Sequence, residues 1–90
     1  FTLSENISTI AFTNIPTTGT YAFTLFVTQD STDRTVAIND ITINGAAGVT
    51  GLTPAGAGYT VSTGSAAKDI LSFVFVNGGT PFITVQQAYA

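Results

Sequence analysis

Catalysis near neutral pH usually needs a side chain that gains or loses a proton in that range, most often a histidine or an activated cysteine. This chain of 90 residues contains neither residue type. A serine nucleophile would need a general base, and the only lysine, Lys68, has no recognisable catalytic motif around it. The inventory therefore argues against an enzyme, and the sequence predicts no catalytic residue and no cofactor.

The five acidic residues are the remaining groups for chemistry, either as a carboxylate pair for glycoside hydrolysis or as metal ligands. Each falls at an expected turn or strand end, where capping of the turn is the simpler role. Calcium at loop 30–33 is a weaker alternative, because calcium needs six or more oxygen ligands and the loop lacks a spaced acidic pattern. The sequence therefore predicts no metal site. The acidic residues are Glu5, Asp30, Asp33, Asp40 and Asp69.

Charge is scarce along the whole chain. Only 8% of the residues are charged and the net charge is −3, whereas charged residues make up about 25% of an ordinary soluble domain. Two cations are too few to neutralise a phosphate backbone, which excludes nucleic acid as a partner. The longest apolar run is far shorter than the ~20 residues of a membrane-spanning helix, so no membrane association is expected. A surface so poor in charge repels other copies weakly and favours a protein interface.

The length of the chain points to the same conclusion. A domain of this size buries only about 60% of the surface that its unfolded chain exposes, which leaves a thin margin of stability. Disulfides or zinc stabilise many small domains, but the absence of cysteine and histidine removes both. Association with other chains is the remaining common source of stability. We therefore expect a single domain over residues 1–90 that works as one copy among many in a symmetric assembly.

The apolar pattern has a period of two, in short runs of β-branched and aromatic residues between turn residues, which predicts antiparallel strands. The two clearest strands span residues 21–29 and 69–76, and the second is apolar on both faces apart from Ser72. The alternation in the first strand directs one set of side chains inward and the other outward. The inward set is Tyr21, Phe23, Leu25 and Val27, and the outward set is Ala22, Thr24, Phe26 and Thr28. Residues 34–38 are expected to form a hairpin with the first strand, with Val36 and Ile38 directed inward. Shorter strands are expected at residues 2–4, 8–13, 41–43, 59–62 and 82–87.

Glycine and asparagine mark the connections. Asn77-Gly78-Gly79 supplies the positive φ values of a tight hairpin turn. The Gly/Ala-rich stretch 44–58 is expected to be a long loop, and Pro54 argues against a central strand there. The spacing of strands and turns predicts an all-β fold, a small antiparallel β-sandwich of jelly-roll type or a barrel of about seven or eight strands.

Apolar side chains on the outward side of the two main strands are the candidate contacts. Phe26 interrupts a polar face, so it belongs either to a second packed layer or to a contact with a neighbouring chain. The second apolar face of strand 69–76 allows the same two explanations. The candidate interface residues are Phe26, Ile70, Val74 and Val76.

Aromatic side chains could instead stack on sugar rings, and this defines the alternative function, a receptor- or carbohydrate-binding adhesive module. Most aromatic residues alternate inward and tryptophan is absent, which places this alternative second. The candidate stacking residues are Tyr21, Tyr59, Phe82 and Tyr89.

Three segments carry a resemblance to a known family. Residues 23–30 with Arg34-Thr35-Val36, and residues 69–75 with 77–82 and a final Gln87-Ala88-Tyr89, resemble a β-module of bacteriophage virion structural proteins. These are tail-fibre and capsid-decoration proteins of marine phages, and the early Phe12-Thr13-Asn14-Ile15-Pro16 also fits. The module usually carries tryptophans and a Trp-Pro-Gly-Gly-type segment in its middle. This chain has Ile41-Thr42-Ile43-Asn44-Gly45 and the Gly/Ala loop there instead.

The resemblance implies a virion location, on the capsid surface or on a tail fibre. It implies capsid or fibre subunits as partners, in the role of decoration, cement or fibre module. The missing tryptophans weaken receptor binding more than the fold, and a host surface glycan is a secondary candidate partner. Because homo-oligomers close by rotation, we expect a homotrimer that covers Phe26 and one face of strand 69–76.

Overall fold

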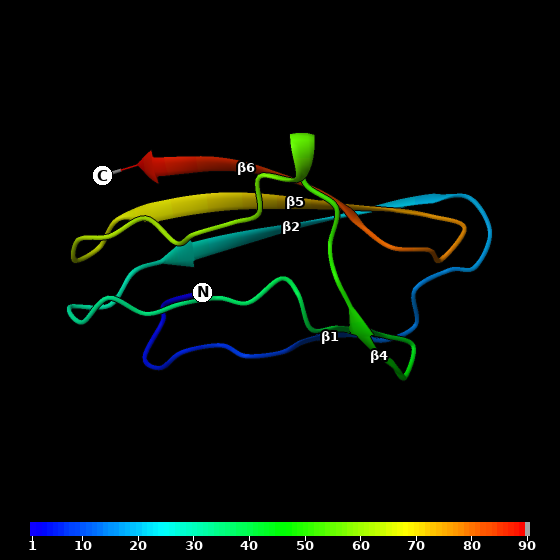
Figure 1. Cartoon of the computed structure of the whole chain (residues 1–90), viewed down its shortest axis with the longest axis horizontal. Coiled ribbons are helices and arrows are strands. Elements are labelled where there is room, and N and C mark those ends of the chain that lie inside the picture. The colour runs from blue at the N-terminus through cyan, green and yellow to red at the C-terminus, as the bar shows by residue number, and fades with distance from the viewer. Residues whose placement is uncertain (90) are drawn as a thin grey trace.

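The computed structural model describes residues 1–89, which form two three-stranded sheets packed face to face (Figure 1). The sheets form a sandwich and do not close into a barrel, so the prediction of a small all-β sandwich is confirmed. No helix in the described part of the chain is long and apolar enough to cross a membrane. The first sheet contains β2 (Thr20–Thr28), β5 (Lys68–Val76) and β6 (Phe82–Tyr89) in the order β2-β5-β6, with antiparallel neighbours.

The second sheet is smaller and mixed. It contains β1 (Ile10–Phe12), β3 (Ile41–Ile43) and β4 (Ala46–Val49) in the order β1-β3-β4. The β3–β4 pair is antiparallel, but β1 and β3 run parallel, because the chain passes through β2 in the other sheet before it returns. Antiparallel pairing alone was therefore an incomplete prediction.

The alternation of side chains along β2 and β5 builds the core between the sheets. Phe23 lies opposite Phe73, and Leu25 lies opposite Leu71, all on the inward face. Phe12 from β1 packs against them from the second sheet, with its ring centroid 5.2 Å from that of Phe73. The inward alternation that the sequence predicts for residues 21–27 is confirmed.

The turn at Asn77-Gly78-Gly79 joins β5 to β6 as predicted. Asn77 and Gly78 both have positive φ, at 51° and 68°. A Cβ on Gly78 would lie 3.3 Å from the backbone oxygen of Pro16, so a larger residue would be crowded there. The Asn77 Oδ1 accepts the Gly19 N–H at 2.8 Å, which fixes the start of β2 beside the turn.

The expected hairpin between β2 and residues 34–38 is wrong. Residues 34–38 lie with the second layer, where Val36 forms an isolated parallel bridge with Ile7. The predicted inward positions of Val36 and Ile38 are nevertheless correct, since both side chains are buried. Two causes prevent the hairpin. The end of β2 already pairs with residues 1–3. The side chains of Val36 and Ile38 are buried only if the chain crosses to the second layer, where they reach the core between the sheets.

The segment 44–58 contains more structure than expected. It includes β4 and a single 3-10 turn (Pro54–Gly56), and Gly51 is buried beside Ile83 and Ile41. Residues 59–62, in contrast, form no strand. The described part of the chain therefore has six strands rather than seven or eight.

Phe73 should contribute more to stability than any aromatic side chain on the outside of the same sheet. Replacing this fully buried ring (Phe73→Ala) should lower the free energy of unfolding by about 3–5 kcal/mol, because it removes buried area and leaves a cavity. Phe82→Ala, on the next strand and half exposed, should change it by less than about 1 kcal/mol. Denaturant unfolding of the two variants compares them, and equal losses would contradict the inward and outward assignment.

Candidate interaction surface

The outward side chains of β2, β5 and β6 form one continuous surface, which we call the outer face. The strand register places Phe26 next to Ile70, and Val74 between Ala22 and Phe82. Val76 lies opposite Thr20 at the end of the same face. The structure thus brings all four candidate interface residues to one side of the sheet that packs on the core with its other side.

The outer face is apolar and open. Phe26 is 60% exposed and Phe82 52% exposed, whereas Ile70 and Val74 are half buried by their strand neighbours. Among residues 1–89, no element of the fold covers this face. Of the two explanations for Phe26, a second packed layer within the same chain is therefore wrong.

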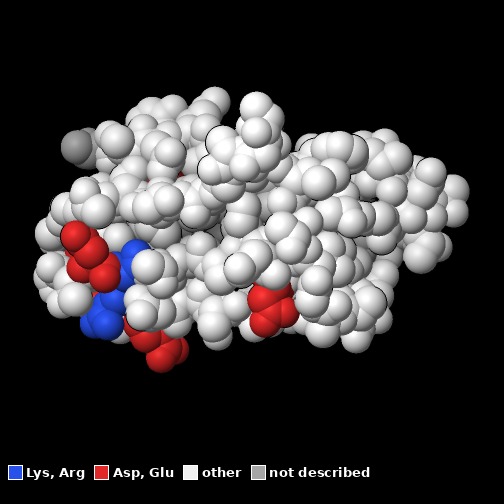
Figure 2. Space-filling model, in the orientation of Figure 1, with Lys and Arg blue, Asp and Glu red and all other residues white. Residues whose placement is uncertain are grey.

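Charge is almost absent from this surface. Lys68, at the first position of β5, is the one charged residue of the outer face within the described chain. Charge is also unevenly distributed on the side of the molecule that Figure 2 shows. Charged side chains gather there toward the end where β2 finishes, and none lies at the opposite end. The apolar part of the outer face therefore meets no charge that would oppose burial against another protein.

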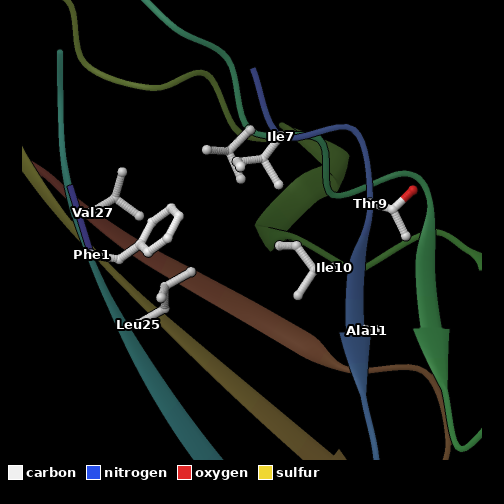
Figure 3. A pocket seen from close by; sticks show the side chains of 8 residues that line it. Phe1, Ile7, Thr9, Ile10, Ala11, Leu25 and Val27 are labelled. Carbon is white, nitrogen blue, oxygen red and sulfur yellow. The ribbon is translucent and has the colours of Figure 1, made fainter. Parts of the chain in front are cut away.

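A second apolar feature is a groove between β1 and β2. Two adjoining pockets of about 310 and 400 Å³ share Ile10, Ala11 and Leu25 in their walls. Figure 3 shows the ring of Phe1 near Leu25 and Val27 at one end of this groove. Within residues 1–89, no charged side chain lines either pocket.

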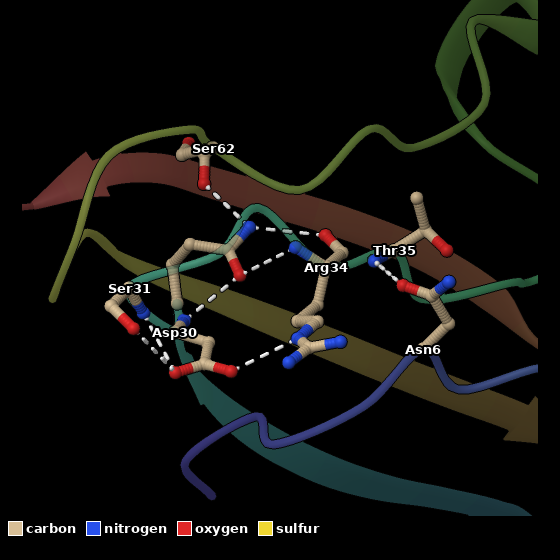
Figure 4. Close-up of polar contacts among 7 residues, drawn as sticks. Asn6, Asp30, Ser31, Arg34, Thr35 and Ser62 are labelled. Carbon is tan, nitrogen blue, oxygen red and sulfur yellow. Dashed lines mark hydrogen bonds and ion pairs between the residues drawn. The ribbon is translucent and has the colours of Figure 1, made fainter.

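The polar loop after β2 is organised by a buried amide. The Oε1 of Gln29 accepts the backbone N–H groups of Asp30 and Arg34, both at 2.9 Å (Figure 4). Its Nε2 donates to the carbonyls of Arg34 and Ser62, at 3.0 and 3.2 Å. Gln29 is only 2% exposed, and all its polar atoms are satisfied. This side chain fixes the turn by which the chain leaves the first sheet, a role that the sequence pattern did not indicate.

The two carboxylates of loop 30–33 have separate partners. The Arg34 Nε donates to the Asp30 Oδ2 at 2.9 Å, and this hydrogen bond holds the pKa of Asp30 below its usual value. The Asp33 Oδ1 accepts the N–H of Gly64 at 3.0 Å. Turn capping, the simpler explanation for both residues, therefore agrees with their hydrogen bonds.

Asp69 is the most deeply buried charged group in the described chain, with 1% exposure. Its carboxylate accepts the Tyr59 hydroxyl at 2.8 Å and the backbone N–H groups of Ser62 and Ala88 at 2.9 and 3.0 Å. Burial alone would raise the pKa of Asp69, but these hydrogen bonds outweigh it and lower the pKa. Burial and the adjacent Asp69 carboxylate also raise the pKa of the Tyr59 hydroxyl.

Asp69 joins segment 59–62 to the end of β6. The position of Asp69 at a strand end predicts a turn cap, and this network was not predicted. One signal was available, since Asp69 shares the inward parity of Leu71, Phe73 and Phe75 on a strand whose inward positions are otherwise apolar.

The four candidate stacking residues are not gathered into one platform. Tyr21 borders the β1–β2 groove and Phe82 lies on the outer face. Tyr59 is half buried with its hydroxyl bound to Asp69, and Tyr89 stands at the end of β6. A sugar site with several aromatic walls is therefore not formed by these residues.

Comparisons of the chain with protein-family models, with curated proteins and with solved structures find no significant match. The fold and its surface define a small two-sheet β-sandwich with an uncovered apolar face. Any narrower functional assignment depends on the residues themselves.

Because of Asp69, the stability of the domain should decrease at low pH. Because its pKa is lower in the folded chain than the ~3.9 of an unfolded one, the carboxylate stabilises the fold above about pH 4. That contribution is lost as the pH falls through the folded pKa. Asp69→Ala should cost about 2–4 kcal/mol at pH 7, because it leaves three partly buried donors without their acceptor, and should reduce the loss of stability below pH 4.

The matched control is Asp40→Ala, since Asp40 is partly exposed and its carboxylate accepts one hydrogen bond, from Thr9. Denaturant unfolding at several pH values between about 2 and 7 compares the two variants with the parent chain. An Asp69→Ala variant as stable at pH 7 as Asp40→Ala would refute the structural role of the network.

Proposed function

We propose that the chain is a structural assembly module of a bacteriophage particle, in capsid decoration or cement or in a tail fibre. It acts by non-covalent contacts between its outer face and other virion proteins, including further copies of itself. The observation that carries the proposal is the uncovered apolar outer face, around Phe26, Val74 and Phe82. The phage assignment rests on the resemblance of residues 23–30 and 69–82 to a virion β-module.

The size of the outer face favours repeated contacts over a single pair. Three strands about 4.8 Å apart, each near 30 Å long, present roughly 400 Å² on one side. A standard interface buries about 800 Å² on each partner, so one copy of this face gives half of that. A symmetric assembly, such as the homotrimer expected from the sequence, holds together through several small contacts that act at once, and this face supplies one of them.

The chemistry of the face also suits assembly better than the alternatives. Its exposed polar side chains are mostly hydroxyls of threonine and serine, which can be buried at a contact at lower cost than charges. The separate positions of the four stacking candidates give no support to a glycan-binding function. A phage particle needs many weak, identical contacts, and a neutral apolar sheet face provides them.

Phe26→Lys should weaken association and leave the fold intact. At 60% exposure, the ring offers roughly 120 Å² to a partner, worth about 3 kcal/mol, so its replacement should reduce association by about 100-fold. The free energy of unfolding should change by less than about 1 kcal/mol, since the side chain is not in the core. Sedimentation velocity and native mass measurement at micromolar concentration would follow association, together with binding to purified particles.

Ser65→Lys is the matched control, because it adds the same charge in an exposed turn outside the sheets. It should leave association unchanged. If Phe26→Lys unfolds the domain, Phe26 is part of the core. If it associates as well as the control, the outer face is not the interface.

A further inference from the structure

The free edge of β2 lacks the features that normally prevent a strand from pairing with another chain. β2 is nine residues long, and it contains no charged residue, proline, glycine or bulge. Natural edge strands are usually short or interrupted by such features. β6, at the opposite edge, has a register shift near its end and is bridged by Leu52 at its start. The unprotected edge of this sheet is therefore the one formed by β2.

The backbone groups at this edge can be assigned from the pairing of residues 1–3. The N–H of Thr28 donates to the Phe1 carbonyl at 2.8 Å, and the Thr28 carbonyl accepts the Leu3 N–H at 2.9 Å. The Phe26 carbonyl accepts the amino group of Phe1 at 2.8 Å. Because backbone groups alternate along a strand, the even-numbered residues of β2 direct their N–H and C=O groups away from β5.

This alternation leaves three residues with hydrogen-bonding groups at the edge. Thr20, Ala22 and Thr24 have no strand opposite them within residues 1–89. On the inward side of the same stretch, Tyr21 and Phe23 are 48% and 44% exposed at the groove. An added strand would pair the backbone groups and cover both rings.

We propose that this strand is β2 of a second copy, paired antiparallel about a twofold axis at Ala22. The two β2-β5-β6 sheets then join into one continuous sheet. This is the register that pairs Thr20, Ala22 and Thr24 of both copies. It leaves Phe26 and Thr28 to the N-terminal segment that already occupies them.

The residues that meet in this register are complementary. Ala22 faces Ala22, and Thr20 faces Thr24 of the second copy, so small side chains lie together on the outward side. On the inward side Tyr21 faces Phe23 of the second copy, which forms two aromatic cross-strand pairs next to the groove. Neither copy brings a charged residue to the contact, whereas a charged peptide would find no complementary charge there.

The edge contact uses the backbone edge of β2 and does not involve the apolar side chains of Phe26, Val74 and Phe82, so it does not depend on the proposed function. It involves few residues of each chain, so its area falls at the low end of protein interfaces, where association is reversible. A reversible twofold contact at the edge, in addition to contacts through the face, would let one small module link neighbours in two directions.

Single cysteines test the register, because the chain contains no cysteine of its own. In Ala22→Cys the two thiols lie on the axis, where paired Cα atoms are about 5.5 Å apart, within the range of a disulfide. Thr20→Cys and Thr24→Cys each place their own two thiols roughly 13 Å apart along the strands, too far to bridge. Mixed in equal amounts, these two variants should cross-link to each other, since position 20 faces position 24. All three positions are exposed.

The expected result, after mild oxidation at about 100 μM, is at least tenfold more covalent dimer for Ala22→Cys than for either threonine variant alone. The mixture should yield the 20–24 heterodimer, identified by intact mass when one of the two variants is labelled with 15N, because the unlabelled variants have equal masses. Addition of Phe26→Lys to Ala22→Cys should leave cross-linking unchanged, which separates the edge from the outer face. Equal cross-linking of all single variants, no cross-linking of Ala22→Cys, or loss of cross-linking with Phe26→Lys would each overturn the proposal.

Discussion

The contact between Phe12 and the inward rings of β5 holds the two sheets together. The ring centroid of Phe12 lies 5.0 Å from that of Phe75 and 5.2 Å from that of Phe73. The ring of Phe23 packs edge-on against Phe12, with 5.6 Å between the centroids. These rings come from three strands in two sheets, and aliphatic side chains such as Ile41, Leu71 and Ile83 complete the core around them. The remaining features of the domain follow from how much apolar surface this small core can cover.

A sandwich of two three-stranded sheets covers one side of each sheet and no more. The chain nevertheless has apolar side chains on both sides of β5, and the core takes only the inward set. The outward set, with Phe26 and Phe82, remains at the surface. The second sheet is also too small to extend over the start of β2. The inward rings of Tyr21 and Phe23 therefore remain partly exposed. Incomplete burial within one chain is thus the common cause of the open face and the open edge.

Hydrogen bonds from neutral side chains connect distant segments of this chain, as ion pairs or disulfides do in other small domains. The side-chain amide of Asn44 both donates to the carbonyl and accepts the N–H of Ile15, each at 2.9 Å, and so ties β3 to the chain after β1. Gln29 organises the crossing between layers, and Asn77 fixes the hairpin to β2. Asp69 is the one buried charge in the described chain, and it is fully hydrogen bonded. With few charges on its surface, the domain keeps its polar groups satisfied internally and leaves its apolar faces free to associate.

The sequence by itself determined the all-β class, the inward set of β2 and β5, the turn at Asn77 and the outward position of Phe26. These depend on the period-two alternation and on local φ preferences, which act over a few residues. The tertiary structure alone decided which strands pair. It moved residues 34–38 to the second layer, made β1 and β3 parallel, and brought Tyr59, Ser62 and Ala88 around Asp69. It also made β2 an edge strand. These features depend on the burial of apolar area and the satisfaction of polar groups between segments far apart in the chain, which no local pattern encodes.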